Sequence, residues 1–198
     1  HDTTYGYDAV GRRVRMTDAD GGVTTYEYDA VGNLLALIDP LSHRSTYLYD
    51  ALNRRVSETL PGSGGAPAST TETVFDAVGN VRAVVDARGH TTAYAYDDLN
   101  RQIARTDALG GVATLAYDKA GNLVASTDEL GRTTRYVYDA QDRRIQAIQP
   151  NPAGGSGDGP ITRYGYDAAG NLVSLTDALG HKTVYGFDAL NRLTTTTY

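Results

Sequence analysis

The chain has 198 residues, of which 24 are acidic and 18 are basic, so its formal net charge is -6 and its pI is about 5.1. This balance argues against nucleic-acid binding and against anchoring to an anionic membrane surface, because both need concentrated Lys and Arg. The sequence has no Cys, which excludes disulfides, thiolate nucleophiles and Cys-based zinc sites. No apolar run approaches the roughly 20 residues of a membrane span, so we expect no membrane insertion.

An aromatic residue followed by Asp recurs nine times along the chain, most often at a spacing of 21 residues. Three residues after each Asp comes Gly, Asn or Asp, the residue types that best tolerate a positive φ. We therefore expect a hairpin turn at each pair, in which the Asp accepts backbone N–H groups and a left-handed residue closes the turn. This repeat signature comprises Tyr7, Asp8, Gly11; Tyr28, Asp29, Gly32; Tyr49, Asp50, Asn53; Phe75, Asp76, Gly79; Tyr96, Asp97, Asn100; Tyr117, Asp118, Gly121; Tyr138, Asp139, Asp142; Tyr166, Asp167, Gly170; and Phe187, Asp188, Asn191.

A second Asp-containing turn is expected half a repeat later, for example at Asp18-Ala19-Asp20-Gly21 and Asp107-Ala108-Leu109-Gly110. In two repeats this second Asp is missing, and a stretch rich in Pro and Gly takes its place. We interpret these stretches, residues 60–73 and 149–162, as loops inserted at one sheet edge, because the repeat resumes unchanged after both.

The segments between turns are about six residues long and rich in Thr, Tyr, Val and Leu, which is typical of strands. No segment shows a sustained helical period. The sequence therefore predicts an all-β fold: an antiparallel meander of tandem ~21-residue, two-stranded repeats that forms a long twisted or spiral sheet of about eighteen strands. We expect residues 1–198 to be a single array of nine repeats and an excerpt of a longer protein.

Side chains two residues apart share a face of a strand, so the two Tyr columns of the repeat should lie on one face. Around the expected turn, Tyr28 would pair with Asn33, and Tyr26 would pair with Leu35. In repeats that have Arg in place of Asn33, the guanidinium would stack over the facing Tyr ring. Cross-strand packing is the favoured role of these aromatics. The alternative is a ligand platform for sugar rings or peptide side chains at Tyr26, Tyr47 and Tyr94.

Few residues suit catalysis or metal binding. His1, His43, His90 and His181 fall in one column after the second turn, too far apart to share a metal ion. The turn Asp residues recur at intervals of about 9.6 Å along each sheet edge, so two of them cannot chelate one calcium ion directly. Capping of their own turns is the favoured role of these Asp residues. We expect no catalytic residue, metal site or cofactor, and hence no enzyme.

The unit Tyr-x-Tyr-Asp-x-x-Gly-Asn/Arg, seen at Tyr26–Asn33 and Tyr164–Asn171, resembles the YD repeat of the rearrangement-hotspot (Rhs) family. The resemblance covers essentially the whole chain. It implies a β-sheet strip wound into a hollow shell, as in bacterial polymorphic toxins, insecticidal toxin complexes and teneurins. In the bacterial members the shell encloses a variable C-terminal toxin, which an Asp-based autoprotease in the closing segment releases. This chain lacks a recognisable closing segment, so neither the protease nor a toxin is assigned to its residues.

The resemblance thus implies a structural segment of a shell that encapsulates a C-terminal toxin and helps to export it. Its partners would be the remainder of its own shell and the enclosed toxin domain, in a bacterial protein that is secreted or held at the cell surface. The alternative is a repeat module that binds carbohydrate or a cell surface, with a cell-surface glycan as its partner. Open strand edges at both ends lead us to expect self-association of the isolated segment.

Overall fold

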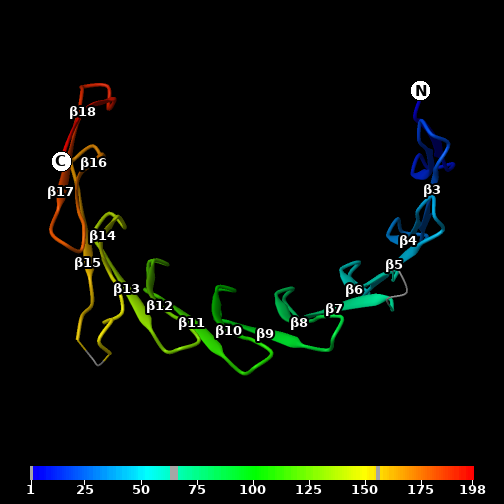
Figure 1. Ribbon diagram of the computed structural model, residues 1–198, viewed down its shortest axis with the longest axis horizontal. Coiled ribbons are helices and arrows are strands. Elements are labelled where there is room, and N and C mark those ends of the chain that lie inside the picture. The colour runs from blue at the N-terminus through cyan, green and yellow to red at the C-terminus, as the bar shows by residue number, and fades with distance from the viewer. Residues whose placement is uncertain (1, 63–66, 155–156) are drawn as a thin grey trace. The chain divides into compact units, whose positions relative to one another are not determined.

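The computed structural model describes residues 2–62, 67–154 and 157–198, and these hold 18 β-strands and no helix (Figure 1). The strands are β1 (Thr4–Tyr7), β2 (Arg13–Thr17), β3 (Val23–Tyr28), β4 (Leu34–Ile38), β5 (Arg44–Tyr49), β6 (Arg55–Leu60), β7 (Ser69–Phe75), β8 (Val81–Val85), β9 (Thr91–Tyr96), β10 (Gln102–Thr106), β11 (Val112–Tyr117), β12 (Leu123–Thr127), β13 (Thr133–Tyr138), β14 (Arg144–Ile148), β15 (Ile161–Tyr166), β16 (Leu172–Thr176), β17 (Lys182–Phe187) and β18 (Leu193–Thr197).

The strands pair with their neighbours in the chain, antiparallel throughout, and are assigned to one sheet. β1 pairs with β2, β2 with β3 and β3 with β4, and the same succession continues to β18. The predicted all-β antiparallel meander is therefore confirmed. Among the described residues, no helix is long and apolar enough to cross a membrane.

The chain divides into two compact units, His1–Tyr94 and Ala95–Tyr198. The first unit holds β1 to β8 and most of β9, and its longest connection follows β6. The second unit holds the end of β9 and β10 to β18, and its longest connection follows β14. Each unit is built from the same two-stranded repeat.

The two inserts are narrower than the ranges expected from the sequence. β7 begins at Ser69, and Leu60 pairs with Ser69, so strand structure occupies both ends of the range 60–73. In the second insert, the Gln149 N–H donates to the Pro160 carbonyl at 2.9 Å, and β15 begins at Ile161. Residues 63–66 and 155–156 of these inserts, and His1 of the His column, lie outside the described residues.

The register across each repeat hairpin differs from the predicted one. Tyr28 pairs with Leu34 instead of Asn33, and Tyr26 pairs with Leu37 instead of Leu35. Two features cause the shift. Asp29 and Asn33 form the closing pair of the turn, and Leu35 is an extra residue in a β-bulge beside Tyr28. The predicted partner of the stacking Arg was also wrong, because Arg12 lies over the ring of Tyr28 in the next repeat and not over the facing Tyr7.

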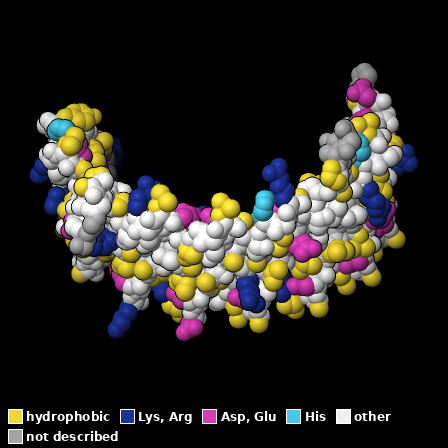
Figure 2. Space-filling view, turned by 60° about the horizontal axis from the view of Figure 1, so that its bottom comes forward, with side chains coloured by type: hydrophobic (Ala, Val, Ile, Leu, Met, Phe, Trp, Pro, Cys, Tyr) yellow, Lys and Arg dark blue, Asp and Glu magenta, His cyan; other side chains and the backbone are white. Residues whose placement is uncertain are grey.

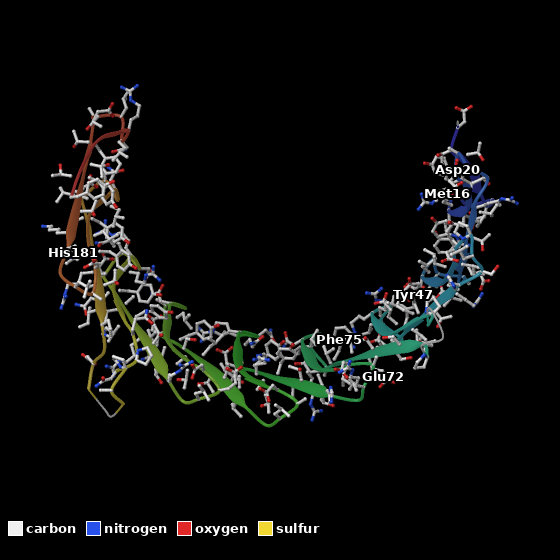
Figure 3. The ribbon with its side chains drawn as sticks, viewed as in Figure 1. Met16, Asp20, Tyr47, Glu72, Phe75 and His181 are labelled. Atoms are coloured by element: carbon white, nitrogen blue, oxygen red, sulfur yellow. The ribbon has the colours of Figure 1, made fainter. Side chains whose placement is uncertain are left out.

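The two faces of the sheet carry different side chains. Figure 3 shows Tyr47 and Phe75 on one side of the ribbon and Glu72 on the other. We call the face that carries the two Tyr columns the Tyr-rich face. Among the described residues, no second layer covers either face, and the buried side chains are Ala36, Ala147, Ile148, Thr24 and Ser45.

The exposed surface agrees with a single layer. The chain exposes 12897 Å², whereas a compact globular monomer of this mass exposes roughly 9,000 Å². Cross-strand contacts and turns, and not a core between two layers, therefore hold each unit together.

Candidate functional site

The turns of the repeat signature, which we call YD turns, share one hydrogen-bond pattern. In the first, Asp8 N–H donates to the Arg12 carbonyl at 2.9 Å, and Gly11 N–H donates to the Asp8 carbonyl at 3.1 Å. The Asp8 carboxylate accepts from the N–H groups of Val10 and Arg12 through Oδ1. The residue three after each Asp has a positive φ in every YD turn. Each signature Asp thus satisfies the backbone donors of its own turn.

The second turns use the same chemistry at the opposite ends of the strands. Asp18 Oδ1 accepts from the N–H groups of Asp20 and Gly22, and Gly21 has a positive φ. The side chain four residues after the Asp, where it is long enough, returns to the free carboxylate oxygen. The Nδ1 atom of His43 lies 2.8 Å from Asp39 Oδ2, and Arg132 Nε donates to Asp128 Oδ2 at 2.7 Å.

From Gly32 onward, the YD turns alternate between two backbone forms. The left-handed residue has φ of 59–60° where it is Asn or Asp: Asn53, Asn100, Asp142 and Asn191. It has φ of 94–104° where it is Gly followed by Asn: Gly32, Gly79, Gly121 and Gly170. In the Gly form an additional backbone N–H reaches the carboxylate, as Gly32 N–H does to Asp29 Oδ1 at 2.8 Å. Gly and Asn are therefore not equivalent at this position.

An Arg after the left-handed residue links one YD turn to the next. Arg12 Nε donates to Asp8 Oδ2 of its own turn at 2.7 Å, and its Nη1 donates to the Asp29 carbonyl of the next turn at 2.8 Å. Its guanidinium carbon also lies 5.0 Å from the centre of the Tyr28 ring, which is cation–π geometry. The same link joins Arg54 to Asp76 and Phe75, Arg101 to Asp118 and Tyr117, and Arg143 to Asp167 and Tyr166.

An Asn at the same position makes the alternate link. Asn33 Nδ2 donates to Asp29 Oδ2 of its own turn at 2.8 Å and to Asn53 Oδ1 of the next turn at 2.9 Å. Asn122 reaches Asp142 at 2.7 Å, and Asn171 reaches Asn191 at 2.9 Å. The Asn or Asp at the left-handed position is therefore an acceptor as well as a turn residue, and Gly cannot replace it in that role.

Sequence reasoning found the alternation of Arg and Asn but missed this acceptor. The signal is in the pairs of adjacent residues: Gly-Asn at Gly32-Asn33 is followed one repeat later by Asn-Arg at Asn53-Arg54, and the pattern continues along the chain. The period of the YD edge is thus two repeats. We call the alternating Arg and Asn links the YD-edge ladder.

The second Tyr column also links repeats. Tyr28 hydroxyl donates to the Arg13 carbonyl of the preceding repeat at 3.1 Å, and Tyr49 hydroxyl donates to the Leu34 carbonyl at 3.0 Å. Tyr138 and Tyr166 make the equivalent bonds to Leu123 and Arg144. These hydroxyls bind backbone carbonyls of the sheet itself.

The predicted ligand platform lies on three separate strands. Tyr26 is in β3, Tyr47 in β5 and Tyr94 in β9, and all three side chains are half-buried. The Arg13 guanidinium carbon lies 4.6 Å from the centre of the Tyr26 ring, and the Arg55 carbon lies 5.4 Å from that of Tyr47. Each of these two rings thus already has a cation against it. Ligand binding by the three Tyr residues stays a prediction.

The described His residues each belong to a different second turn. The Nδ1 atoms of His43, His90 and His181 lie 2.8, 3.1 and 2.9 Å from Oδ2 of the Asp in their own turn. Within residues 2–62, 67–154 and 157–198, no group of three His, Cys, Asp or Glu side chains could hold a metal ion.

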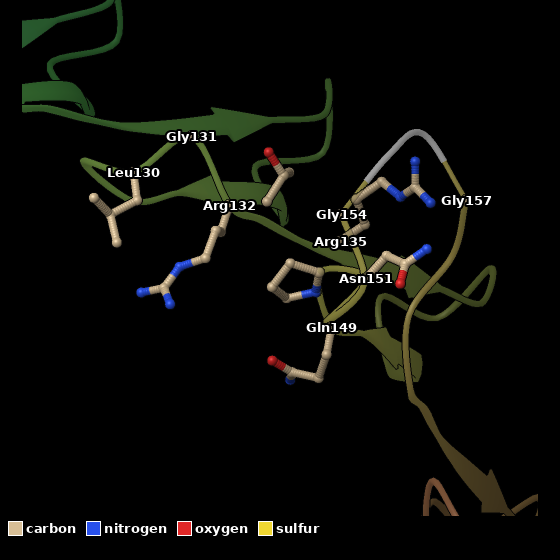
Figure 4. A pocket seen from close by; sticks show the side chains of 10 residues that line it. Leu130, Gly131, Arg132, Arg135, Gln149, Asn151, Gly154 and Gly157 are labelled. Atoms are coloured by element: carbon tan, nitrogen blue, oxygen red, sulfur yellow. The ribbon is translucent and has the colours of Figure 1, made fainter.

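The second insert borders a hollow of about 480 Å³. In Figure 4 its walls come from the turn at Leu130 and Arg132, from Arg135 of β13, and from the insert at Gln149 and Asn151. Both guanidiniums are paired, Arg132 with Asp128 and Arg135 with Asp158.

The carboxyl groups of the YD turns are held in their charged form. A hydrogen bond from the Arg12 side chain, followed by one from its backbone N–H, lowers the pKa of Asp8. At Asp97 the backbone N–H of Arg101 is the larger cause of the lowered pKa. Carboxyl groups that stay ionised and saturated with donors are poor proton shuttles, because general acid–base catalysis needs a pKa near the working pH. The arrangement suits turn formation and linkage between repeats.

Comparison with protein families identifies the repeat. A family model described as RHS Repeat matches residues 2–23, 7–44, 28–64, 75–112, 117–153, 156–182 and 166–198. The sequence matches no curated protein.

Solved structures share the fold. The crystal structure of TcdB2-TccC3-Cdc42 matches with a TM-score of 0.60 and 17% identity over 98% of this chain. That of TcdB2-TccC3 without the hypervariable C-terminal region matches with a TM-score of 0.59 and 18% identity, also over 98%. The Photorhabdus luminescens Tc holotoxin pore matches with a TM-score of 0.54 and 19% identity over 96%. This chain spans only 12–13% of the length of those chains.

Proposed function

Because the chain belongs to the RHS repeat family, we propose that it is a structural segment of a β-sheet shell that encloses a C-terminal toxin domain and helps to export it. Its partners are the remainder of its own shell and the enclosed domain. The whole protein is bacterial and is secreted or held at the cell surface. The segment itself is not catalytic.

The YD-edge ladder carries this proposal. Within each unit, a side chain joins successive YD turns, and among the described residues no helix or second layer supports the sheet. The wall of a shell needs such lateral continuity between repeats. The Arg side chains of the ladder form these links and also pair with the Asp of their own turns.

Exposed apolar side chains at the YD turns support the proposal that this segment contacts further protein. The third residue after the aromatic in many YD turns is aliphatic and exposed: Val10, Val31, Leu52, Val78, Leu99 and Leu190. Figure 2 shows hydrophobic side chains recurring on the surface between acidic and basic ones. Regular exposed apolar groups favour contact with further protein. In the whole protein this is the rest of the shell, and in the isolated segment it is another copy.

The test uses the full-length protein. Limited proteolysis should leave the C-terminal domain intact while it is enclosed. Replacing two ladder acceptors, Asn53→Gly and Asn191→Gly, should loosen the wall and make that domain cleavable. The matched control is Ser42→Gly, at a left-handed residue of a second turn. Rapid cleavage of the C-terminal domain in the unaltered protein would refute enclosure.

A further inference from the structure

One column of the Tyr-rich face places Arg between aromatic rings of successive repeats. The Arg13 guanidinium carbon lies 5.8 Å from the centre of the Tyr5 ring and 4.6 Å from that of Tyr26. In the other unit, the Arg144 carbon lies 5.6 Å from the Tyr136 ring and 4.8 Å from the Tyr164 ring. Arg144 also donates to the Tyr164 hydroxyl at 3.3 Å. Two equivalent positions thus give the same arrangement, one cation and two rings.

Arg55 occupies the same column but has only one ring. Its guanidinium carbon lies 5.4 Å from the centre of the Tyr47 ring. The second ring is missing because the next repeat has Thr73 where seven of the nine repeats have Tyr. A hollow of about 120 Å³ lies in its place, lined by Arg55, Ser57, Glu58, Thr71 and Thr73.

The size and lining of this hollow suit a phenol ring. In volume it is comparable to cavities of about 150 Å³ that hold a benzene ring, but its lining is polar, which suits a ring that carries a hydroxyl. Arg55 offers a cation to the face of an incoming ring, as Arg13 and Arg144 do to theirs. Glu58 lies directly between Tyr47 and Thr71 in the cross-strand pairing, and its Oε2 is 3.4 Å from Arg55 Nη2. Its carboxylate can accept a hydrogen bond from a phenol hydroxyl.

We propose that this hollow binds the ring of a Tyr side chain from a polypeptide that lies against the Tyr-rich face, so that a foreign ring completes the arrangement left open at Thr73. Arg55 stacks between the incoming ring and Tyr47, and the Glu58 carboxylate accepts a hydrogen bond from the hydroxyl of the incoming ring. The identity of the polypeptide as the enclosed domain rests on the proposed function, whereas the hollow itself does not.

The test measures binding of N-acetyl-tyrosinamide to the full chain by NMR titration, with resonances of Tyr47 and Thr73 as reporters. Thr73→Tyr fills the hollow with the residue that other repeats carry, so it should weaken binding at least about tenfold and leave the fold intact. The control is Leu115→Tyr, which restores Tyr in the other repeat that lacks it but leaves the Thr73 hollow open. This variant should bind the probe as the unaltered chain does.

Arg55→Leu should weaken binding as well, because it removes the cation that stacks with the ring. N-acetyl-phenylalaninamide, which lacks the hydroxyl, should bind more weakly than the tyrosine probe. Equal binding by the Thr73→Tyr variant and the unaltered chain, or shifts far from Tyr47 and Thr73, would overturn the proposal. Proteolytic protection of the C-terminal domain in full-length Thr73→Tyr protein reports on enclosure separately, so the two proposals can fail independently.

Discussion

The two edges of the sheet use the same Asp turn but differ in what surrounds it. At the YD edge, the residue four after the Asp alternates between Arg and Asn, and these side chains reach the next turn. At the second-turn edge, the corresponding residue is Gly22, His43, His90, Gly111, Arg132 or His181. Where that residue is His or Arg, it binds its own Asp.

Both inserts lie at the second-turn edge. A turn that binds the next turn cannot lengthen without breaking two sets of hydrogen bonds, whereas a turn that closes on itself can be replaced by a loop at little cost in free energy. The difference between the edges thus explains why both inserts lie at the second-turn edge. The YD edge links successive repeats through a recurring side chain, whereas at the second-turn edge such a link is seen between Arg105 and Glu129 of the next second turn.

Acid should break both edges at once and give the largest effect. The pKa is lowered at the Asp of every YD turn and at Asp39, Asp86, Asp128 and Asp177 of the second turns. A folded-state pKa below the unfolded value of 3.8 means that the stabilisation is full above that pH. It is lost as the pH falls through the folded-state values. Thermal unfolding followed by circular dichroism should show Tm falling by at least about 10 °C between pH 6 and pH 2.5. A constant Tm over that range would contradict the role of these carboxylates.

A change at the left-handed residue of a YD turn should come next. Gly79 has φ of 104°, where a β-branched side chain is strained, so Gly79→Val should lower the free energy of unfolding by at least about 1 kcal/mol. Gly79→Asn should cost less but should not be silent, because Asn at this position elsewhere has φ of 60°. Urea denaturation of both variants measures the difference. Ala77→Val, at an exposed position of the same turn, is the control and should have little effect. Equal stability of the Val and Asn variants would refute the turn assignment.

Loss of one ladder acceptor should have a smaller effect that separates the edges. Asn53→Gly keeps a residue suited to positive φ but removes the acceptor of Asn33 Nδ2, at a cost of about 0.5–1.5 kcal/mol. Ser42→Gly makes a comparable change at the second-turn edge, where φ is 65°, and should stay within about 0.5 kcal/mol of the unaltered chain. A double-mutant cycle with Asn33→Ala should show coupling to Asn53. Equal losses for Asn53→Gly and Ser42→Gly would mean that the edges do not differ.

The sequence predicted the strands, the turns and the all-β meander because each depends on local chemistry repeated many times. The nine Asp residues and the left-handed residues that follow them define the turns without knowledge of the fold. The register could not be read from the same signals, since a bulge residue such as Leu35 looks like any other strand residue until the hydrogen bonds are known. The ladder was missed for a related reason. Its hydrogen bonds join residues 17 to 24 positions apart in the sequence. The only local sign of them is the alternation of Gly-Asn with Asn-Arg pairs.

Shortening an insert should have the smallest effect and tests the tolerance of the second-turn edge directly. β6 and β7 remain paired as far as Leu60 and Ser69, so a two-residue Asn-Gly turn in place of residues 61–68 can close the hairpin. A shorter loop costs slightly less closure entropy, and Tm should therefore stay within about 2 °C of the unaltered chain or rise. The matched change at the YD edge is insertion of the same eight residues between Val78 and Gly79. This insertion interrupts the link from Arg54 to the Asp76 turn and should lower Tm by several-fold more than the deletion changes it. If the deletion lowered Tm as much as the insertion does, the second-turn edge would contribute as much to the stability of the sheet as the YD edge, and the contrast between the two edges would fail.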